Sequence, residues 1–162
     1  MSDKYFIDTN ILIYSFDETA LEKQKVAQQI IQNALTNGSG VISSQVIQEF
    51  FNVAIRKFSS PMSLEDCSNY LHSVLIPLCQ VFTSAKLYEN TLNLMKTYNY
   101  TLYDSLIIAA AIEANCTILY SEDLQHNQKI GKLKIINPFK EMTDLSAQAN
   151  AFPKVSTKPR KA

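Results

Sequence analysis

The chain has 162 residues, of which 46% are hydrophobic and 19% charged, a balance typical of one globular domain with a full core and not of a disordered chain. No apolar run reaches the roughly 18 residues that a membrane span needs, and the N-terminus enters a predicted strand with no room for a signal peptide. The formal net charge is zero, which predicts no binding of polyanions by bulk charge but does not exclude a nucleic-acid substrate held through metal ions.

Short apolar runs alternate with longer amphipathic segments along most of the chain. The apolar runs predict strands at residues 5–7, 41–42, 79–82, 116–120 and 134–136. Helical periodicity and capping residues predict helices at residues 22–35, 45–58, 63–75, 84–98 and from 101 onward. Because strands that alternate with helices favour a parallel sheet, we predict a three-layer α/β/α fold with a roughly five-stranded parallel sheet.

We expect one domain over residues 1–143. Residues 144–162 lose the periodicity, which predicts a polar, basic, flexible tail. The cysteines Cys67, Cys79 and Cys116 show no C-x-x-C spacing, and the two histidines are isolated from them. Buried reduced thiols are therefore predicted in place of a zinc site, and the chain is expected in the cytoplasm with no membrane contact.

The most informative pattern is a set of acidic residues placed where a predicted strand ends or a helix begins. These residues are Asp8, Glu49, Asp104 and Asp123. The carboxyl ends of parallel strands share one edge of the sheet, where α/β folds place their sites. Four carboxylates gathered there would repel one another unless cations lie between them, and such oxygen ligands suit Mg²⁺ or Mn²⁺. These ions activate water and neutralise a leaving oxygen, so the pattern predicts metal-dependent hydrolysis of phosphodiester bonds.

Asp8 and Glu49 each have a simpler interpretation as well. Asp8 follows a buried strand and could serve only to cap a turn or a helix. Glu49 lies on the polar face of its helix, where an ordinary solvated glutamate is equally expected. The same face carries Gln45, Asn52 and Arg56, which would place polar groups beside it. Helix spacing alone does not separate the two interpretations of Glu49.

Asp104 and Asp123 have rival interpretations too. The spacing Thr101-x-x-Asp104 imitates a capping box, in which Asp104 would serve the helix backbone. The helix that follows is too apolar for a surface position, so its N-terminus is expected near the strand ends. Asp123 follows the predicted strand 116–120 and could be a loop acid without a role. The neighbouring Glu122 could also take its place.

Five short motifs surround these acids and follow one another over residues 4–140. They are Phe6-Ile-Asp8-Thr-Asn10, Ser44-Gln-Val-Ile-Gln-Glu49-Phe, Tyr103-Asp104-Ser-Leu-Ile-Ile-Ala-Ala-Ala111, Ile118-Leu-Tyr-Ser121-Glu-Asp123-Leu and Ile135-Ile-Asn137-Pro138-Phe139. In order and spacing the chain resembles a PIN domain, and within that superfamily the VapC-type toxins of bacterial and archaeal toxin–antitoxin pairs. The chain departs from the pattern at Ser121, where many members carry threonine; serine keeps the hydroxyl.

This resemblance implies a Mg²⁺- or Mn²⁺-dependent endoribonuclease that cleaves structured RNA, typically transfer or ribosomal RNA. The four acids would bind the metal and carry catalysis. Thr9, Asn10 and Ser121 would orient those carboxylates. The resemblance also implies a homodimer and a cognate antitoxin protein that occupies the cleft.

Contacts to RNA would come from outside the acidic set. Candidate phosphate contacts are the basic side chains Arg56, Lys57, Lys129, Lys132 and Lys134. The aromatic residues close in sequence to the acids, which could stack an unpaired base, are Tyr103, Tyr14 and Phe16. Each basic residue is also explained as a solvated surface charge, and each aromatic residue as part of the core.

Other functions remain to be weighed against this one. A haloacid-dehalogenase-like phosphatase needs a second aspartate two positions after the first, where this chain has Asn10. A response-regulator receiver needs an adjacent acidic pair before its strand-end aspartate, which this chain lacks. A third alternative is a non-catalytic PIN-like module that binds RNA or a protein without cutting. Metal-dependent activity would distinguish the enzyme from that module.

Overall fold

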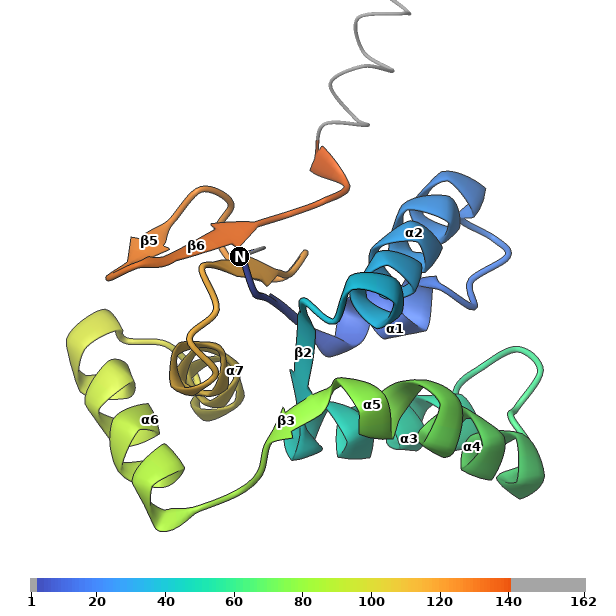
Figure 1. The fold of residues 1–162 in the computed structure, drawn as a ribbon, viewed down its shortest axis with the longest axis horizontal. Coiled ribbons are helices and arrows are strands. Elements are labelled where there is room, and N and C mark those ends of the chain that lie inside the picture. Colours follow the sequence, from blue (N-terminus) through green and yellow to red (C-terminus); the bar gives the residue numbers. More distant parts are fainter. Residues whose placement is uncertain (1–2, 141–162) are drawn as a thin grey trace, which may run out of the picture.

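The computed structural model describes residues 3–140, which form a six-stranded sheet with helices on both sides (Figure 1). The strands are β1 (Tyr5–Ile7), β2 (Gly40–Ser43), β3 (Cys79–Val81), β4 (Ile118–Tyr120), β5 (Lys129–Ile130) and β6 (Leu133–Ile136). Their order is β3-β2-β1-β4-β6-β5, and the first five in this order run parallel. The predicted three-layer α/β/α architecture and its five parallel strands are confirmed.

The sixth strand, β5, was not expected from the sequence. It has only two residues and pairs antiparallel with β6, through Lys129 opposite Lys134 and Ile130 opposite Leu133. The turn between them contains Gly131 at a positive φ of 58°, a conformation that glycine adopts without strain. So short a strand carries too little periodicity to be recognised from its residues.

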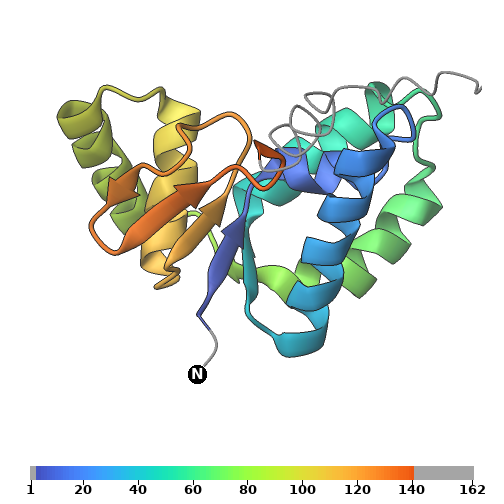
Figure 2. The same cartoon turned by 90° about the horizontal axis from the view of Figure 1, so that it is seen from above.

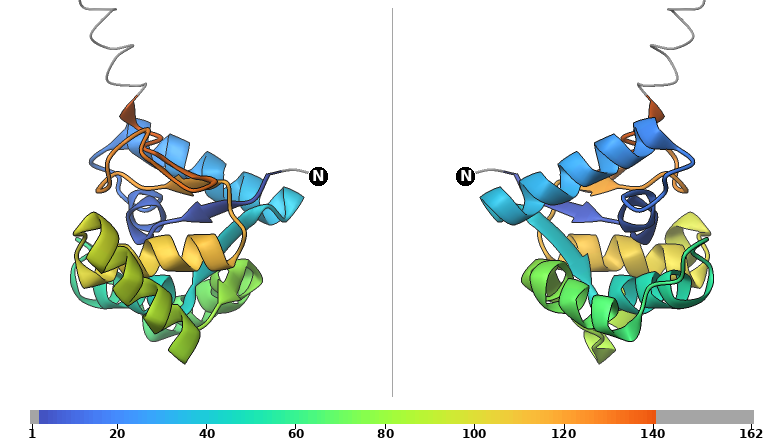
Figure 3. Two further views of the ribbon diagram at one scale, coloured as in Figure 1. Left: turned by 90° about the vertical axis from the view of Figure 1, so that its left-hand side faces the viewer. Right: turned by 90° about the vertical axis from the view of Figure 1, so that its right-hand side faces the viewer.

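The helices enclose the sheet in two groups. They are α1 (Thr9–Tyr14), α2 (Leu21–Asn37), α3 (Ser44–Arg56), α4 (Leu64–Tyr70), α5 (Ile76–Leu78), α6 (Ala85–Tyr98) and α7 (Leu102–Glu113), with a π-helical turn, η1 (Leu71–Leu75), between α4 and α5. Helices α2 and α7 lie on opposite sides of β1 (Figure 3). Helix α6 packs against the outer side of α7. Helices α3, α4 and α5 lie together near β2 and β3, away from α6 (Figure 2).

Helix α7 shows how burial follows composition. Its residues Ile108 to Ala111 are almost completely buried, because the sheet covers one side of the helix and α6 covers another. A helix that is apolar nearly all round is stable only when it is enclosed in this way. The burial of α7 fixes its N-terminus, which carries Asp104, at the carboxyl edge of the sheet.

The helix predicted to end near residue 75 continues to Leu78. Its continuation passes through the π-helical turn η1 and then through Pro77, which lies in the first two positions of α5. Proline lacks a backbone N–H but is tolerated at a helix start, where that N–H has no partner within the helix. The widened turn before Pro77 therefore replaces the break that the sequence predicted.

No helix among residues 3–140 is both long and apolar enough to cross a bilayer. The predicted domain boundary at residue 143 and the tail over residues 144–162 lie outside the residues that the structure describes. The free thiols Cys67 and Cys116 are buried, as the sequence predicted, whereas Cys79 is half-buried.

Candidate active site

All four predicted acids line one cavity of about 350 Å³. The carboxyl ends of β1 and β4, the middle of α3 and the N-terminus of α7 each supply one of them. The remaining lining residues are Thr9, Asn10, Ile13, Asn52, Val53, Tyr103 and Ile107. The structure therefore brings together side chains that are up to 115 positions apart in the sequence, from Asp8 to Asp123.

Asp8 is both a helix cap and a member of the cavity. It is the N-cap of α1, and its Oδ1 accepts a hydrogen bond of 2.7 Å from the backbone N–H of Thr9. Its Oδ2 accepts a second bond of 2.7 Å from the hydroxyl of Ser121. Capping and a place in the site, which the sequence presented as alternatives, are two functions of one side chain.

Burial raises the pKa of Asp8 from its usual 3.8 to about 6. The hydrogen bonds from Ser121 and Thr9 oppose this rise, because they favour the charged carboxylate. The neighbouring carboxylates of Glu49 and Asp123 add to the rise, because a second negative charge nearby disfavours ionisation. A raised carboxyl pKa inside a cavity marks a place where negative charge lacks compensation.

Glu49 is held on the inner side of α3 by two donors. Helix α3 buries Val46 and Phe50 on its apolar face, and Glu49 lies on the polar face that meets α1. The hydroxyl of Thr9 donates to its Oε2 over 2.5 Å, and Nε2 of Gln45 donates to its Oε1 over 2.6 Å. The interpretation of Glu49 as an ordinary solvated glutamate does not fit these contacts.

Asp104 lines the cavity from the first turn of α7. The hydroxyl of Thr101, the N-cap residue, accepts a hydrogen bond of 3.2 Å from the backbone N–H of Asp104. This is one half of the capping box that the sequence suggested. The other half is absent, because the carboxylate of Asp104 makes no hydrogen bond with any residue from 3 to 140. That carboxylate is available to a ligand.

Asp123 faces the cavity, and the adjacent Glu122 faces away from it. Nδ2 of Asn10 donates to Oδ2 of Asp123 over 3.1 Å, and the hydroxyl of Ser121 accepts from the Asp123 backbone N–H over 3.3 Å. Glu122 instead forms an ion pair of 2.5 Å with Lys23 on α2. Of the two acids that the sequence left open, the structure puts Asp123 in the cavity.

The residues of the cavity fit a hard divalent cation by their chemistry. Every candidate ligand is an oxygen atom, as Mg²⁺ and Mn²⁺ prefer, and Oδ1 of Asn10 is buried without a hydrogen-bond partner among residues 3–140. Within residues 3–140, however, no three Asp, Glu, His or Cys side chains are grouped closely enough to hold one ion. The carboxylates stay apart because like charges repel, and because neutral donors hold those of Asp8, Glu49 and Asp123. A bound ion would require these side chains to draw together.

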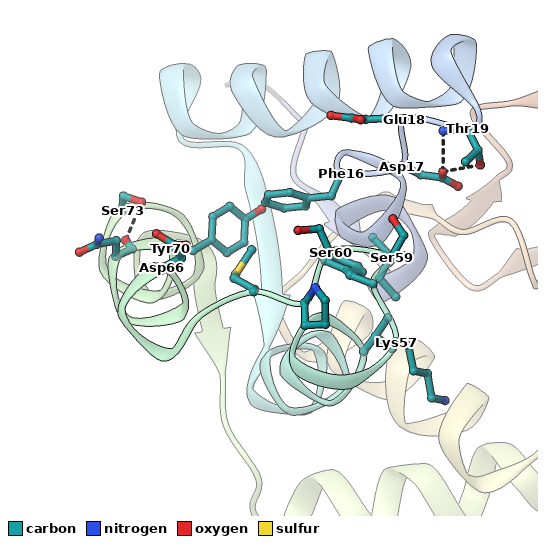
Figure 4. A pocket seen from close by; sticks show the side chains of 16 residues that line it. Phe16, Asp17, Glu18, Thr19, Lys57, Ser59, Ser60, Asp66, Tyr70 and Ser73 are labelled. Carbon is teal, nitrogen blue, oxygen red and sulfur yellow. Dashed lines mark hydrogen bonds between the residues drawn. The ribbon is translucent and has the colours of Figure 1, made fainter.

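A second, larger cavity of about 930 Å³ adjoins the first and shares Ile13 and Val53 with it. We call it the α1–α4 groove, because it lies between the end of α1, the loop after α3, and α4. Its wall is aromatic: the rings of Phe16 and Tyr70 meet edge to face with centroids 5.2 Å apart (Figure 4). The acids Asp17, Glu18 and Asp66 and the base Lys57 lie around these rings.

The predicted RNA contacts are dispersed. Tyr103 lines the acidic cavity and is 65% exposed. Lys57 borders the α1–α4 groove, and Arg56 is exposed at the end of α3. The exposed Lys129 and Lys132 and the half-buried Lys134 belong to the β5–β6 hairpin at the edge of the sheet. Tyr14 packs on Phe139, and Phe16 joins the aromatic wall of the groove.

The sequence pattern did not single out the apolar lining of the cavity. Val53 lies four residues after Glu49, and Ile107 three residues after Asp104. These spacings place each apolar residue on the same helix face as an acid, one turn further along. Helical spacing from each acid was therefore the signal that could have found them.

Comparisons with known proteins agree with this arrangement. A family model of the PIN domain matches residues 5–131. No match was found among curated protein sequences. Among solved structures, the chain is similar to a toxin–antitoxin complex from Klebsiella pneumoniae, with a TM-score of 0.57 and 18% identity over 83% of this chain and 98% of the other.

Two further structures share the fold. VapBC2 from Rickettsia felis, bound to a DNA fragment from its promoter, gives a TM-score of 0.58 and 18% identity, covering 81% of this chain and 96% of the other. VapC20 from Mycobacterium tuberculosis, a toxin that cleaves the sarcin–ricin loop, gives a TM-score of 0.52 and 15% identity, covering 73% and 88%. At these identities the similarity shows a common fold.

Proposed function

The chain belongs to the PIN domain family of nucleases, and from that premise we propose that it is a Mg²⁺- or Mn²⁺-dependent endoribonuclease, the toxin of a toxin–antitoxin pair. One observation carries the proposal: Asp8, Glu49, Asp104 and Asp123, from four separate segments, line one cavity. Helix capping explains the position of Asp8, but it does not explain why three further carboxylates line the same cavity. Their mutual repulsion is a cost that a cation-binding site explains.

The four acids would hold the ion, with the buried Oδ1 of Asn10 beside them, which has no hydrogen-bond partner within the described residues. When bound, such an ion supplies a nucleophile at neutral pH and neutralises charge at the phosphate. Asp8 must lose its proton before it can act as a ligand. The hydrogen bonds from Ser121 and the Thr9 backbone lower its pKa, and so favour the form that binds.

The neutral side chains around the acids fix their orientation. The Thr9 hydroxyl and the Gln45 amide hold both oxygens of Glu49, and the Asn10 amide holds one oxygen of Asp123. Gln45 also reaches the backbone carbonyl of Tyr103 over 3.5 Å, which links α3 to the start of α7. These bonds limit how far each carboxylate can move from the position in which it meets a ligand.

For the substrate we propose structured RNA, transfer or ribosomal, cut at an unpaired position. The exposed ring of Tyr103 at the cavity can stack an unpaired base, which RNA-binding proteins commonly use for recognition. The shared fold with a toxin that cleaves the sarcin–ricin loop supports a ribosomal or similarly folded target. The exposed basic residues Arg56, Lys57, Lys129 and Lys132 are proposed as more distant phosphate contacts.

For the partner we propose an antitoxin protein that contacts the α1–α4 groove. The shared fold with toxin–antitoxin complexes supports such a partner. Because Ile13 and Val53 line both cavities, an occupant of the groove borders the acidic cavity and can block RNA.

We also propose that the protein is a cytoplasmic homodimer. Exposed apolar side chains such as Phe82 and Leu92 offer surface for the second copy. Light scattering of the purified protein tests the dimer.

The test is cleavage of total transfer and ribosomal RNA by the purified protein with Mg²⁺ or Mn²⁺, and again with EDTA. Asp104→Asn is the test variant, and Asp66→Asn, an exposed acid at the α1–α4 groove, is the matched control. We expect fragments that disappear with EDTA and in Asp104→Asn but persist in Asp66→Asn. Cleavage that survives in Asp104→Asn would contradict the proposed site.

A second candidate is a PIN-like module that binds RNA or a protein without cutting. It is favoured by one observation, the lack of a closely grouped set of three metal ligands in residues 3–140. The same experiment separates the two. RNA retention without fragments, in protein shown to be folded and saturated with Mn²⁺, would support the binding module.

A further inference from the structure

The loop after β4 presents its side chains alternately to the cavity and to α2. The hydroxyl of Ser121 meets Asp8, and Asp123 meets Asn10, so both face the cavity. Glu122, between them, points the other way and reaches Lys23 on α2. This short loop thus supplies Ser121 and Asp123 to the site. On its other side, Glu122 binds the loop to α2 through Lys23.

The loop is held by four residues from four segments of the chain: Tyr14 in α1, Lys23 in α2, Glu122 in the loop itself, and Phe139 after β6. Nζ of Lys23 lies 2.5 Å from Oε1 of Glu122 and 3.3 Å from the hydroxyl of Tyr14, the last residue of α1. The same ammonium lies over two aromatic faces, 4.7 Å from the ring centroid of Tyr14 and 5.4 Å from that of Phe139. We call these four residues the Lys23 cluster.

The cluster is well suited to hold the loop. The side chains of Lys23 and Glu122 are 35% and 25% exposed, so their contact is less weakened by solvent than that of a fully exposed ion pair. The carboxylate of Glu122 is held by this direct contact, because its Oε1 lies 2.5 Å from Nζ of Lys23.

Lys23 also keeps the carboxylate of Glu122 away from the cavity, where it would compete with Asp123 for a cation. An unpaired Glu122 carboxylate beside Asp123 would add a fifth negative charge next to the cavity and could turn toward a bound cation. The ammonium neutralises that charge and fixes the side chain on the side of α2. Glu122 thus stays on the side of α2, and Asp123 is the one of these two adjacent acids that lines the cavity.

We propose that the Lys23–Glu122 ion pair is a positioning device that holds the loop carrying Ser121 and Asp123 against Asp8. Lys23 and Glu122 are positioning residues that act through these two neighbours. The effect on metal binding rests on the proposed nuclease function, whereas the effect on the loop itself does not.

The experiment compares Lys23→Met with Lys23→Arg, which keeps the charge, and with Lys86→Met as a matched control. Lys86 pairs with Glu89 on α6 over 3.9 Å, with both side chains more than two-thirds exposed and outside the site. Two quantities are measured for each folded variant: amide hydrogen exchange at Asp123 in metal-free protein, and Mn²⁺ affinity by calorimetry.

We expect Lys23→Met to speed exchange at the Asp123 amide and to weaken Mn²⁺ binding. Loss of a partner that directly orients a metal ligand costs 10–100-fold in metal affinity, and because Glu122 acts one residue further away we expect about tenfold or less. Lys23→Arg and Lys86→Met should resemble the native protein in both quantities.

Native exchange at Asp123 in Lys23→Met would overturn the proposal. Faster exchange with unchanged Mn²⁺ affinity would show that the ion pair holds the loop, but it would overturn the role of Lys23 in positioning Asp123 for metal. If the native protein itself takes up no Mn²⁺, the proposed metal-dependent function fails. The exchange measurement then still decides whether the ion pair holds the loop.

Discussion

Replacing Asp8 by asparagine should stabilise the metal-free protein at alkaline pH. The buried carboxyl has its pKa raised from 3.8 to about 6, so the folded state binds this proton more tightly than the unfolded state does. The stabilisation from that proton is fully present below pH 3.8 and is lost as the pH rises through about 6. Asparagine is neutral at every pH and is an equally good N-cap.

The size of the effect follows from the two pKa values. A tenfold change in proton affinity corresponds to about 1.4 kcal/mol, so the shift from 3.8 to about 6 makes Asp8→Asn more stable by about 3 kcal/mol at pH 8. At pH 5 the difference should fall to about half of that. For a chain of this length, 3 kcal/mol corresponds to a rise in melting temperature of about 6–12 °C.

Thermal and urea unfolding at pH 5 and pH 8, each with EDTA, measure this difference. Asp17→Asn is the control, because hydrogen bonds from Thr19 lower the pKa of Asp17, so its replacement should show no such gain at pH 8. Saturating Mn²⁺ should stabilise the native protein and leave Asp8→Asn unchanged. Destabilisation of metal-free Asp8→Asn at pH 8, or an effect equal at both pH values, would contradict a raised pKa at Asp8.

Three further substitutions test other parts of the account. Ser121→Ala removes a hydrogen bond that lowers the pKa of Asp8, so the acidic limb of the pH–cleavage profile should move to higher pH; a move to lower pH would contradict this. Tyr103→Ala should weaken RNA binding by about 1–3 kcal/mol, the usual value of base–aromatic stacking, seen as a higher KM with kcat little changed; a loss in kcat alone would argue against stacking. Gly40→Ala would place a Cβ 2.2 Å from that of Ala34 and should cost about 1–3 kcal/mol in urea unfolding because β2 and α2 must separate; native stability would show that this contact is not tight.

The positions of Asp8 and Asp104 could be predicted because sheet topology determines them. A residue that directly follows a parallel strand, or opens a helix beside it, lies at the carboxyl edge of the sheet wherever its side chain points. The structure places both residues at that edge, where they line one cavity. Whether that cavity holds a metal ion stays a prediction.

Two features of the site could not be predicted from the sequence: the contact that holds Glu49, and which of Glu122 and Asp123 lines the cavity. Helix periodicity showed which face of α3 carries Glu49 but not that Thr9 of α1 lies opposite it. Glu122 contacts Lys23, which is 99 residues away from it in the chain, and Asp123 lines the cavity. Such pairings are tertiary contacts, and local propensity carries no information on them.

The sequence presented helix capping and a place in the site as alternatives for Asp8 and Asp104, but one residue can do both. Asp8 caps α1 and lines the cavity with the same carboxylate. At the start of α7, Thr101 caps the helix, and the carboxylate of Asp104 lines the cavity and makes no return bond to the Thr101 backbone within residues 3–140. A capping motif therefore describes the backbone partner of a residue and leaves its second contact open.

The most direct test of the central claim is anomalous diffraction from crystals soaked in Mn²⁺. We expect an anomalous peak in the acidic cavity within bonding distance of carboxylate oxygens of Asp8 and Asp104, with Glu49 and Asp123 drawn toward it. The peak should vanish in Asp104→Asn crystals. A cavity without a peak at saturating Mn²⁺, or a peak only at other surface acids, would contradict the claim that these four carboxylates form a metal site.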